Sequence, residues 1–188
     1  MMEEKELVRL SQQGDKESFG LLVKRYETKV HHLAFQFTRN NAVSDDLAQE
    51  IFIKAYFGLP KFKGQSGFGT WLYRIGVNHI KDYLRKKPKE LSLEVVPEDR
   101  SGRSDAPARE QEARDDAHRR SVVRACLQAM PSNHRIILTL RDIEGLSYDE
   151  VARTLRISPG TVDSRLFRAR QMLRKQVVAF LEKEGRAL

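Results

Sequence analysis

The stretch LSYDEVARTLRISPGTVDSRLFRARQMLRK, residues 146–175, has the pattern of two helices joined by a short turn. Ser147 stands where an N-cap is expected, and Glu150 follows at the spacing of a capping box. Ser158 and Pro159 predict the start of another helix, because Ser accepts from unpaired amides and Pro fits the first helical position. The stretch therefore predicts a capped helix, a tight turn and a second helix.

The predicted second helix has an apolar face and a polar, basic face. The apolar residues recur at helical spacing and can pack on the first helix: Val162, Leu166, Ala169 and Leu173. The other face carries side chains that can reach bases and phosphates: Thr161, Ser164, Arg165 and Arg168. Over residues 151–175 there are seven Lys or Arg and one acid, Asp163. This predicts a helix-turn-helix that reads the major groove, although a helical hairpin with a solvated basic face fits the same pattern.

Length and composition limit the class of protein. A chain of 188 residues can form one medium or two small domains, and its net charge of +8 favours a polyanionic partner or a membrane surface. No apolar run approaches the roughly 18 residues that span a bilayer, and the start MMEEKELVRL lacks signal-peptide features. The single Cys126 fits a reducing compartment. We therefore expect a soluble cytoplasmic protein with no direct membrane contact.

Helical periodicity runs through most of the chain, and no stretch alternates for long as a strand does. Residues 3–12 predict a short helix that stops at Gly14. Asp15 predicts the start of a long helix that reaches about Arg39. Apolar residues at helical spacing form its expected buried face: Phe19, Leu22, Val23, Tyr26, Val30, Leu33 and Phe37.

The segment DDLAQEIFIKAYFGL, residues 45–59, predicts an amphipathic helix with Ser44 as its N-cap. Leu47, Ile51 and Ala55 can face inward. The outer face then combines acids, an amide and apolar groups: Asp46, Gln49, Glu50, Ile53 and Phe57. Exposed apolar groups rimmed by polar ones are typical of a protein contact surface, whereas a helix buried on both sides would give the same pattern.

Residues 56–87 interleave aromatic rings with Lys and Arg. Trp71, Leu72, Ile75 and Ile80 form an expected inward stripe, and the Gly-rich loop FKGQSGFGT, residues 62–70, ends at Thr70 as the expected N-cap. Rings beside cations suit single-stranded nucleic acid, because unpaired bases stack while phosphates are neutralised. A core aromatic cluster with a solvated basic face is the alternative.

An acidic segment broken by proline, residues 88–113, predicts a flexible linker. It would tether two small helical domains, residues 1–87 and 114–188, so that each settles at its own site on one partner. In the second domain, a helix around Cys126 and another from Arg135 to Ile143 are expected to precede the helix-turn-helix. The sequence thus predicts an all-α fold of two small domains.

No motif predicts catalysis. The chain has no Gly-rich phosphate loop with Lys and Ser or Thr, and its five His never combine with Cys or acids at metal-ligand spacing. We expect a binding protein rather than an enzyme, with no cofactor and no metal site.

Three segments in this order and spacing resemble bacterial RNA polymerase sigma factors of the extracytoplasmic-function (ECF, group IV) class: DDLAQEIFIKAY, FKGQSGFGTWLYRIGVNHIKDYLRKK and LRDIEGLSYDEVARTLRISPGTVDSRLFRAR. The resemblance covers nearly the whole chain except the linker and the last dozen residues. It implies a promoter-specificity subunit, with sigma region 2 in residues 1–87 and sigma region 4 in residues 114–188.

The resemblance also implies roles for individual residues. Asp46, Gln49, Glu50 and Phe52 would contact the clamp helices of the large catalytic subunit of core RNA polymerase. Lys63, Phe68, Trp71, Asn78 and Lys81 would touch the separated non-template strand at the minus-ten element. Thr161, Ser164, Arg165, Phe167 and Arg168 would read duplex DNA at the minus-thirty-five element. The polymerase flap and an anti-sigma factor are further implied partners.

Asp163 departs from the family pattern, in which many members carry Lys or Arg. A carboxylate repels phosphate but accepts a hydrogen bond from a cytosine amino group, so the usual minus-thirty-five sequence is not expected here.

The implied mechanism is binding without covalent chemistry. The first domain docks on polymerase, the helix-turn-helix sets the position on duplex DNA, and captured bases shift the duplex toward the open state. One alternative is a stand-alone helix-turn-helix regulator that binds paired half-sites as a dimer. Another is an adaptor whose basic helices bind protein or membrane.

Overall fold

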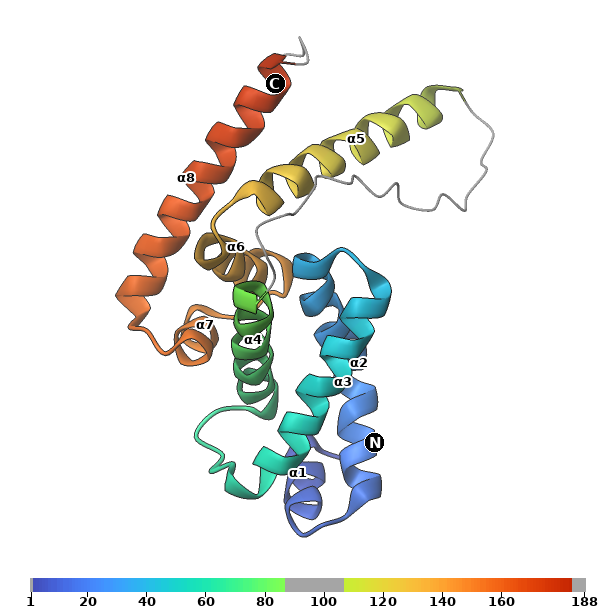
Figure 1. Ribbon diagram of the computed structural model, residues 1–188, viewed down its shortest axis with the longest axis vertical. Helices are drawn as coiled ribbons and strands as arrows, with labels where there is room; N and C mark the ends of the chain where they lie inside the picture. The colour runs from blue at the N-terminus through green and yellow to red at the C-terminus, as the bar shows by residue number, and fades with distance from the viewer. Residues whose placement is uncertain (1, 87–106, 184–188) are drawn as a thin grey trace.

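The computed structural model describes residues 2–86 and 107–183 (Figure 1). Its α-helices are α1 (Glu4–Gln12), α2 (Lys16–Thr38), α3 (Asn41–Gly58), α4 (Phe68–Lys86), α5 (Pro107–Ala129), α6 (Ser132–Leu138), α7 (Tyr148–Leu155) and α8 (Pro159–Lys183). A 3-10 turn, η1 (Leu59–Lys61), follows α3, and a π-helical segment, η2 (Thr139–Ile143), continues α6. These two ranges contain no strand, which confirms the all-α prediction.

The first two helices begin and end where the sequence predicted. The side chain of Asp15 accepts from the amides of Glu17 and Ser18 and so caps α2. The helix stops at Arg39, whose left-handed φ of 53° breaks the helical path. Before it, Gly14 closes α1 with a φ of 97°, a conformation that glycine adopts without steric cost.

The start of α3 differs from the prediction. The side chain of Asn40 accepts from the Val43 amide, so the helix begins at Asn41 and Ser44 lies inside it. Ser44 is fully buried, donates to the Asn40 carbonyl at 2.7 Å and lies 2.5 Å from the Thr38 hydroxyl. The prediction of Ser44 as N-cap was wrong, because an equally good capping residue stands four positions earlier.

The start of α4 also differs from the prediction. The helix begins at Phe68, and the Trp71 amide already donates to the Gly67 carbonyl at 3.2 Å. Thr70 therefore sits in the first turn, where it is 6% exposed, and the prediction that it caps the helix was wrong. The Gly-rich loop is therefore shorter than expected, and the rings of Phe68 and Trp71 both belong to α4.

Helices α1 to α4 pack around the core of the first domain. The predicted inward residues of α3 are buried: Leu47, Ile51 and Ala55. Gly76 lets α4 approach its neighbours closely, because a Cβ there would lie 3.1 Å from Leu33 Cδ2 and 3.5 Å from Ile51 Cδ1. These two atoms belong to α2 and α3. The absence of a side chain at Gly76 therefore allows α2, α3 and α4 to pack closely.

The second domain is made of α5 to α8. Helix α5 starts at Pro107, so residues 107–113 of the predicted linker are helical, while residues 88–106 lie outside the described residues. Cys126 is 5% exposed, as expected for a small hydrophobe, and burial raises the pKa of its thiol. Figure 1 shows two long helices here: α5, which has one end beside α6, and α8, which starts beside α7.

The two domains are in contact. Helix α4 packs on α2 and α3 and also on α7, and in Figure 1 it lies between the two sets of helices. One continuous apolar cluster contains Phe37 and Val77 of the first domain and Ile136 and Val151 of the second. The sequence left the relative packing of the two domains open, because the apolar positions of α4 were interpreted only as an inward stripe of the first domain. No helix in the described ranges is long and apolar enough to cross a membrane.

Ile51 and Ile53 provide a matched test of this packing. Ile51 has no exposed surface and Ile53 is 55% exposed, two positions apart in one helix. Ile51→Ala should lower the free energy of unfolding by about 2–5 kcal/mol, because it leaves a cavity. Ile53→Ala should change it by less than about 0.5 kcal/mol. Urea denaturation followed by circular dichroism measures both, and equal effects would contradict the assigned orientation of α3.

Candidate nucleic-acid interface and protein-contact surface

Caps define the ends of both helices of the helix-turn-helix, α7 and α8. The Ser147 hydroxyl accepts from the Glu150 amide at 3.3 Å, and the Glu150 carboxylate accepts from the Ser147 amide at 2.8 Å. Arg156 takes a left-handed φ of 55° and ends α7. The Ser158 hydroxyl then accepts from the Thr161 amide at 3.2 Å. Both predicted N-caps of the helix-turn-helix are confirmed.

Helix α8 presents the predicted faces. Val162, Leu166 and Ala169 have no exposed surface, and Leu173 is half-buried against the same core. The residues expected to read DNA lie together on the first three turns: Thr161 is half-buried, and Ser164, Arg165, Phe167 and Arg168 are exposed. Phe167 is 64% exposed, so its ring adds apolar surface beside these polar side chains. The arrangement offers a solvated row of hydroxyl, guanidinium and apolar groups.

A bidentate ion pair orients this row. Arg170 donates from Nε to Asp142 Oδ2 at 3.1 Å and from a terminal nitrogen to Oδ1 at 2.6 Å. Hydrogen bonding to Asp142 raises the pKa of the guanidinium. The pair ties α8 to η2 and leaves Arg165 and Arg168 as the outward guanidinium groups of these turns. No local pattern in the sequence connects two residues 28 positions apart.

The outer face of α3 forms the second candidate surface. Asp46, Gln49 and Glu50 are exposed, as predicted. Ile53 is 55% exposed and Phe57 is 74% exposed on the same face, whereas Phe52 is half-buried against the core of the first domain. The structure therefore brings the three polar residues together with Ile53 and Phe57 and turns Phe52 partly inward. This composition is typical of a protein contact surface.

His79 of α4 lies behind Glu50 and was missed by the sequence interpretation. Its side chain is 10% exposed, and Nε2 lies 2.6 Å from Glu50 Oε2, although its N–H is not aligned with that oxygen. Nδ1 lies 2.5 Å from Lys54 Nζ. Because an ammonium can only donate, Nδ1 accepts from Lys54 and the ring proton sits on Nε2, close to the carboxylate but not directed at its oxygen. Because His79 and Glu50 are 29 positions apart, no local sequence pattern indicates that they meet.

The residues expected at the minus-ten element fall into two groups. Lys63, Asn78 and Lys81 are exposed. Phe68 is 2% exposed and Trp71 is 7% exposed, and both rings pack with Phe62, whose centroid lies 5.0 Å from that of Trp71. The rings form a hydrophobic floor beneath the loop and have little surface on which a base could stack in this state.

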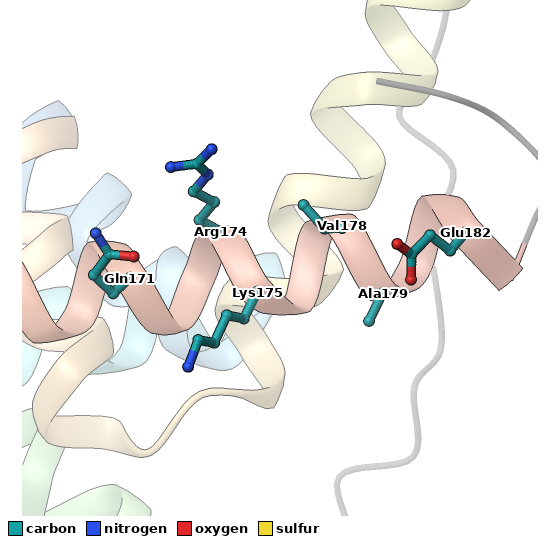
Figure 2. Close-up of a pocket in the computed structure, with 6 residues that line it drawn as sticks. All are labelled: Gln171, Arg174, Lys175, Val178, Ala179 and Glu182. Atoms are coloured by element: carbon teal, nitrogen blue, oxygen red, sulfur yellow. The ribbon is translucent and has the colours of Figure 1, made fainter.

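No group of three or more His, Cys, Asp or Glu within residues 2–86 and 107–183 is arranged to hold a metal ion. Figure 2 shows a pocket on the C-terminal half of α8. It is lined by Gln171, Arg174, Lys175, Val178, Ala179 and Glu182. These residues all belong to one helix, so the pocket is a surface depression and differs from the concave, mostly apolar cavity of a small-molecule site.

Two protein families match the two halves of the chain. The family Sigma-70 region 2 matches residues 22–90, and the family Sigma-70, region 4 matches residues 120–173. The chain therefore belongs to the bacterial sigma-70 factors. The ECF RNA polymerase sigma-E factor of Haemophilus influenzae is 38% identical, over 91% of this chain and 93% of that protein. Within the sigma-70 factors, this chain belongs to the ECF class.

Solved structures agree with this assignment. CnrH in complex with the cytosolic domain of CnrY superposes with a TM-score of 0.70 at 26% identity, over 94% of this chain and 97% of CnrH. The sigma factor RpoE in complex with the anti-sigma factor NepR from Bartonella quintana shares the fold, with a TM-score of 0.65 at 20% identity over 86% of this chain and 97% of that one.

Membership of the ECF class decides between the functions left open by the sequence. The chain is a non-enzymatic sigma factor that directs core RNA polymerase to specific promoters and initiates transcription. A stand-alone helix-turn-helix regulator and a basic adaptor are thereby set aside.

The capping box predicts a pH dependence of stability. Hydrogen bonds from the Ser147 amide and hydroxyl lower the pKa of Glu150. A lowered pKa stabilises the folded state above the unfolded value of about 4.3, and this contribution is lost as the pH falls through the folded pKa. Glu150→Gln should therefore lower the free energy of unfolding by about 0.3–1 kcal/mol at pH 7, with a smaller loss below pH 4.

Urea titrations at several pH values measure this difference. Asp149→Asn is the matched control, because Asp149 lies in the same first turn without the bonds to Ser147. A Glu150→Gln effect that stays constant down to pH 3 would contradict the charged capping box.

Proposed function

We propose that the exposed row at the start of α8 reads the minus-thirty-five element of promoter DNA. The observation that carries this proposal is the exposure of Ser164, Arg165, Phe167 and Arg168 on the helix that follows the capped turn. A guanidinium fits the O6 and N7 acceptors of guanine, and an apolar ring suits the thymine methyl group. Asp163 is exposed beside them and adds an acceptor for a cytosine amino group.

We infer that the outer face of α3 binds the clamp helices of core polymerase. Asp46, Gln49 and Glu50 supply polar contacts, while Ile53 and Phe57 supply apolar surface that water would otherwise cover. The partly inward Phe52 supports the contact from beneath, through its packing on the core. The His79 ring of α4 lies behind this face, with Nε2 at 2.6 Å from the Glu50 carboxylate.

We propose that the loop before α4 and the exposed side of α4 meet the non-template strand at the minus-ten element. Lys63 and Lys81 would neutralise phosphates, and Asn78 would bond to a base edge. Phe68 and Trp71 would shape the loop from below, and they would stack on bases only after leaving their present packing with Phe62.

We further propose that the chain acts in the cytoplasm, contacts the polymerase flap through its second domain, and is held inactive by an anti-sigma factor. The support is the class itself, together with the fold that the chain shares with a sigma factor solved with its anti-sigma factor. An amphipathic surface such as that of α3 suits both polymerase and an inhibitor that competes with it.

Arg168→Ala should weaken binding to the minus-thirty-five element by about 1–3 kcal/mol if the guanidinium is bidentate to a guanine. Holoenzyme binding to promoter duplexes with each base changed in turn measures the effect, and the loss should vanish on duplexes that lack that guanine. Lys183→Ala, at the far end of the same helix, is the charge-matched control. An equal loss on every base variant would mean that Arg168 contacts only phosphate.

Glu50→Lys should abolish most binding to core polymerase and leave the fold intact, because Glu50 is exposed at the centre of the proposed contact. Glu27→Lys makes the same charge change at an exposed position of α2 and should bind normally. Size-exclusion chromatography with bacterial core polymerase measures both, with circular dichroism as the check on folding. Normal co-elution of the Glu50→Lys chain would reject this surface as the polymerase site.

A further inference from the structure

The Gly-rich loop between η1 and α4, residues 62–67, has little structure of its own. Among the residues that the structure describes, no hydrogen bond between backbone groups involves residues 63–66. Gly64 turns the chain with a φ of 67°, and the Ser66 hydroxyl donates only to the neighbouring Gly67 carbonyl, at 3.3 Å. The path of the loop therefore depends on how its two ends are held.

Gln12, the last residue of α1, holds the first end of the loop. Its side-chain nitrogen donates to the Leu59 carbonyl at 3.0 Å and to the Phe62 carbonyl at 2.8 Å. Carbonyl oxygens only accept, so the amide directs its nitrogen at η1 and uses both of its protons there. Carbonyls at the end of a helical turn lack a partner within it, and Gln12 supplies one from another helix.

Tyr26 of α2 holds the other end of the loop. Its ring meets the Phe68 ring edge-on, with 5.5 Å between the centroids. A Cβ at Gly69 would lie 2.9 Å from the Tyr26 hydroxyl oxygen, so the backbone can approach the ring this closely only without a side chain. The hydroxyl donates to Glu4 at 2.5 Å, and burial followed by this bond raises the pKa of Tyr26. Residues of α1 thus act on both ends of the loop.

Helix α1 is itself held by the first-domain core. Leu7 and Val8 are buried and belong to the same apolar cluster as Leu59 and Phe68. The helix packs on α2, on η1 and on α4. The supports of the loop therefore stand on a part of the domain that moves only when the core opens.

We propose that Gln12 is a positioning residue for the minus-ten element, holding the start of the loop in the conformation that receives unpaired bases. This inference rests on the proposed function in one respect, namely that the loop and α4 meet the non-template strand. Gln12 acts through the loop and makes no contact with DNA itself. A loop that is already ordered loses less conformational entropy on binding. It also adapts less to a wrong base, so Gln12 contributes to the choice of bases as well as to affinity.

Gln12→Met tests this inference, because methionine keeps the length of the side chain and removes both donated hydrogen bonds. Gln13→Met is the matched control: Gln13 is exposed, and its side chain accepts from Arg9 at 3.3 Å instead of reaching the loop. Gln12→Glu is a second variant, in which a carboxylate that only accepts faces the same two carbonyls. A spin label at Gln65→Cys, in a Cys126→Ala chain, reports the mobility of the loop by electron paramagnetic resonance.

Binding is measured by fluorescence anisotropy, with holoenzyme assembled from bacterial core polymerase. The probe is the labelled non-template minus-ten strand of a promoter that the wild-type holoenzyme opens in vitro, with each base changed in turn. Gln12→Met should make the spin label more mobile and weaken binding of the unchanged strand by about five- to thirtyfold. It should also reduce the differences between base variants, which a change in stability alone would leave intact.

The other variants and probes separate positioning from a folding defect. Gln12→Glu should weaken strand binding at least as much as Gln12→Met, and Gln13→Met should match wild type in mobility, affinity and base preference. Co-elution with core polymerase and binding to a duplex that carries the minus-thirty-five element alone should not change in any of the three variants.

Three results would overturn the role of Gln12. The loop label would be no more mobile in Gln12→Met than in wild type, Gln13→Met would act as Gln12→Met does, or Gln12→Met would leave affinity and base preference unchanged while Lys63→Ala weakens strand binding. A failure of the proposed function looks different. The loop would loosen in Gln12→Met, yet neither that variant nor Lys63→Ala would affect the strand, which would reject the loop as the minus-ten surface and Gln12 with it.

Discussion

The packing of α4 from two sides is the constraint on which the rest of the structure depends. Gly76 admits the side chains of Leu33 and Ile51 on one side, and Tyr73 and Val77 join the cluster shared with the second domain on the other. The same helix starts with the rings that support the Gly-rich loop. A shift of α4 would therefore change the first-domain core, the loop and the contact between domains together.

The basic charge of the chain has two separate uses. Several guanidinium groups serve the fold: Arg141 donates to the Leu146 carbonyl at 2.9 Å and covers the Tyr148 ring, and Arg170 is paired with Asp142. Arg165 and Arg168 instead point outward from the first turns of α8. The net charge alone therefore overstates the basic surface that can face DNA. Arginines that are paired within the fold are structural, whereas exposed arginines can meet phosphates and bases.

Local patterns in the sequence predicted the helices, both caps of the helix-turn-helix and the outer face of α3. They failed where two equivalent signals competed, as with Asn40 and Ser44 four positions apart. They left open whether the aromatic rings beside cations stack on bases or form a core. Trp71 is buried, as its inward stripe predicted, and Phe68 is buried as well. The other features that the sequence did not reveal are tertiary contacts. Glu144 meets His32 across 112 positions, and no periodicity or composition carries that information.

Because Cys126 is buried, the reactivity of its thiol can report local unfolding of this chain. It is the single thiol of the 188 residues, it is a buried residue of α5, and its raised pKa keeps it protonated at neutral pH. The thiolate is the reactive species, so a thiol reagent must wait until α5 detaches locally. The labelling rate of the unmodified protein therefore reports the local opening of α5.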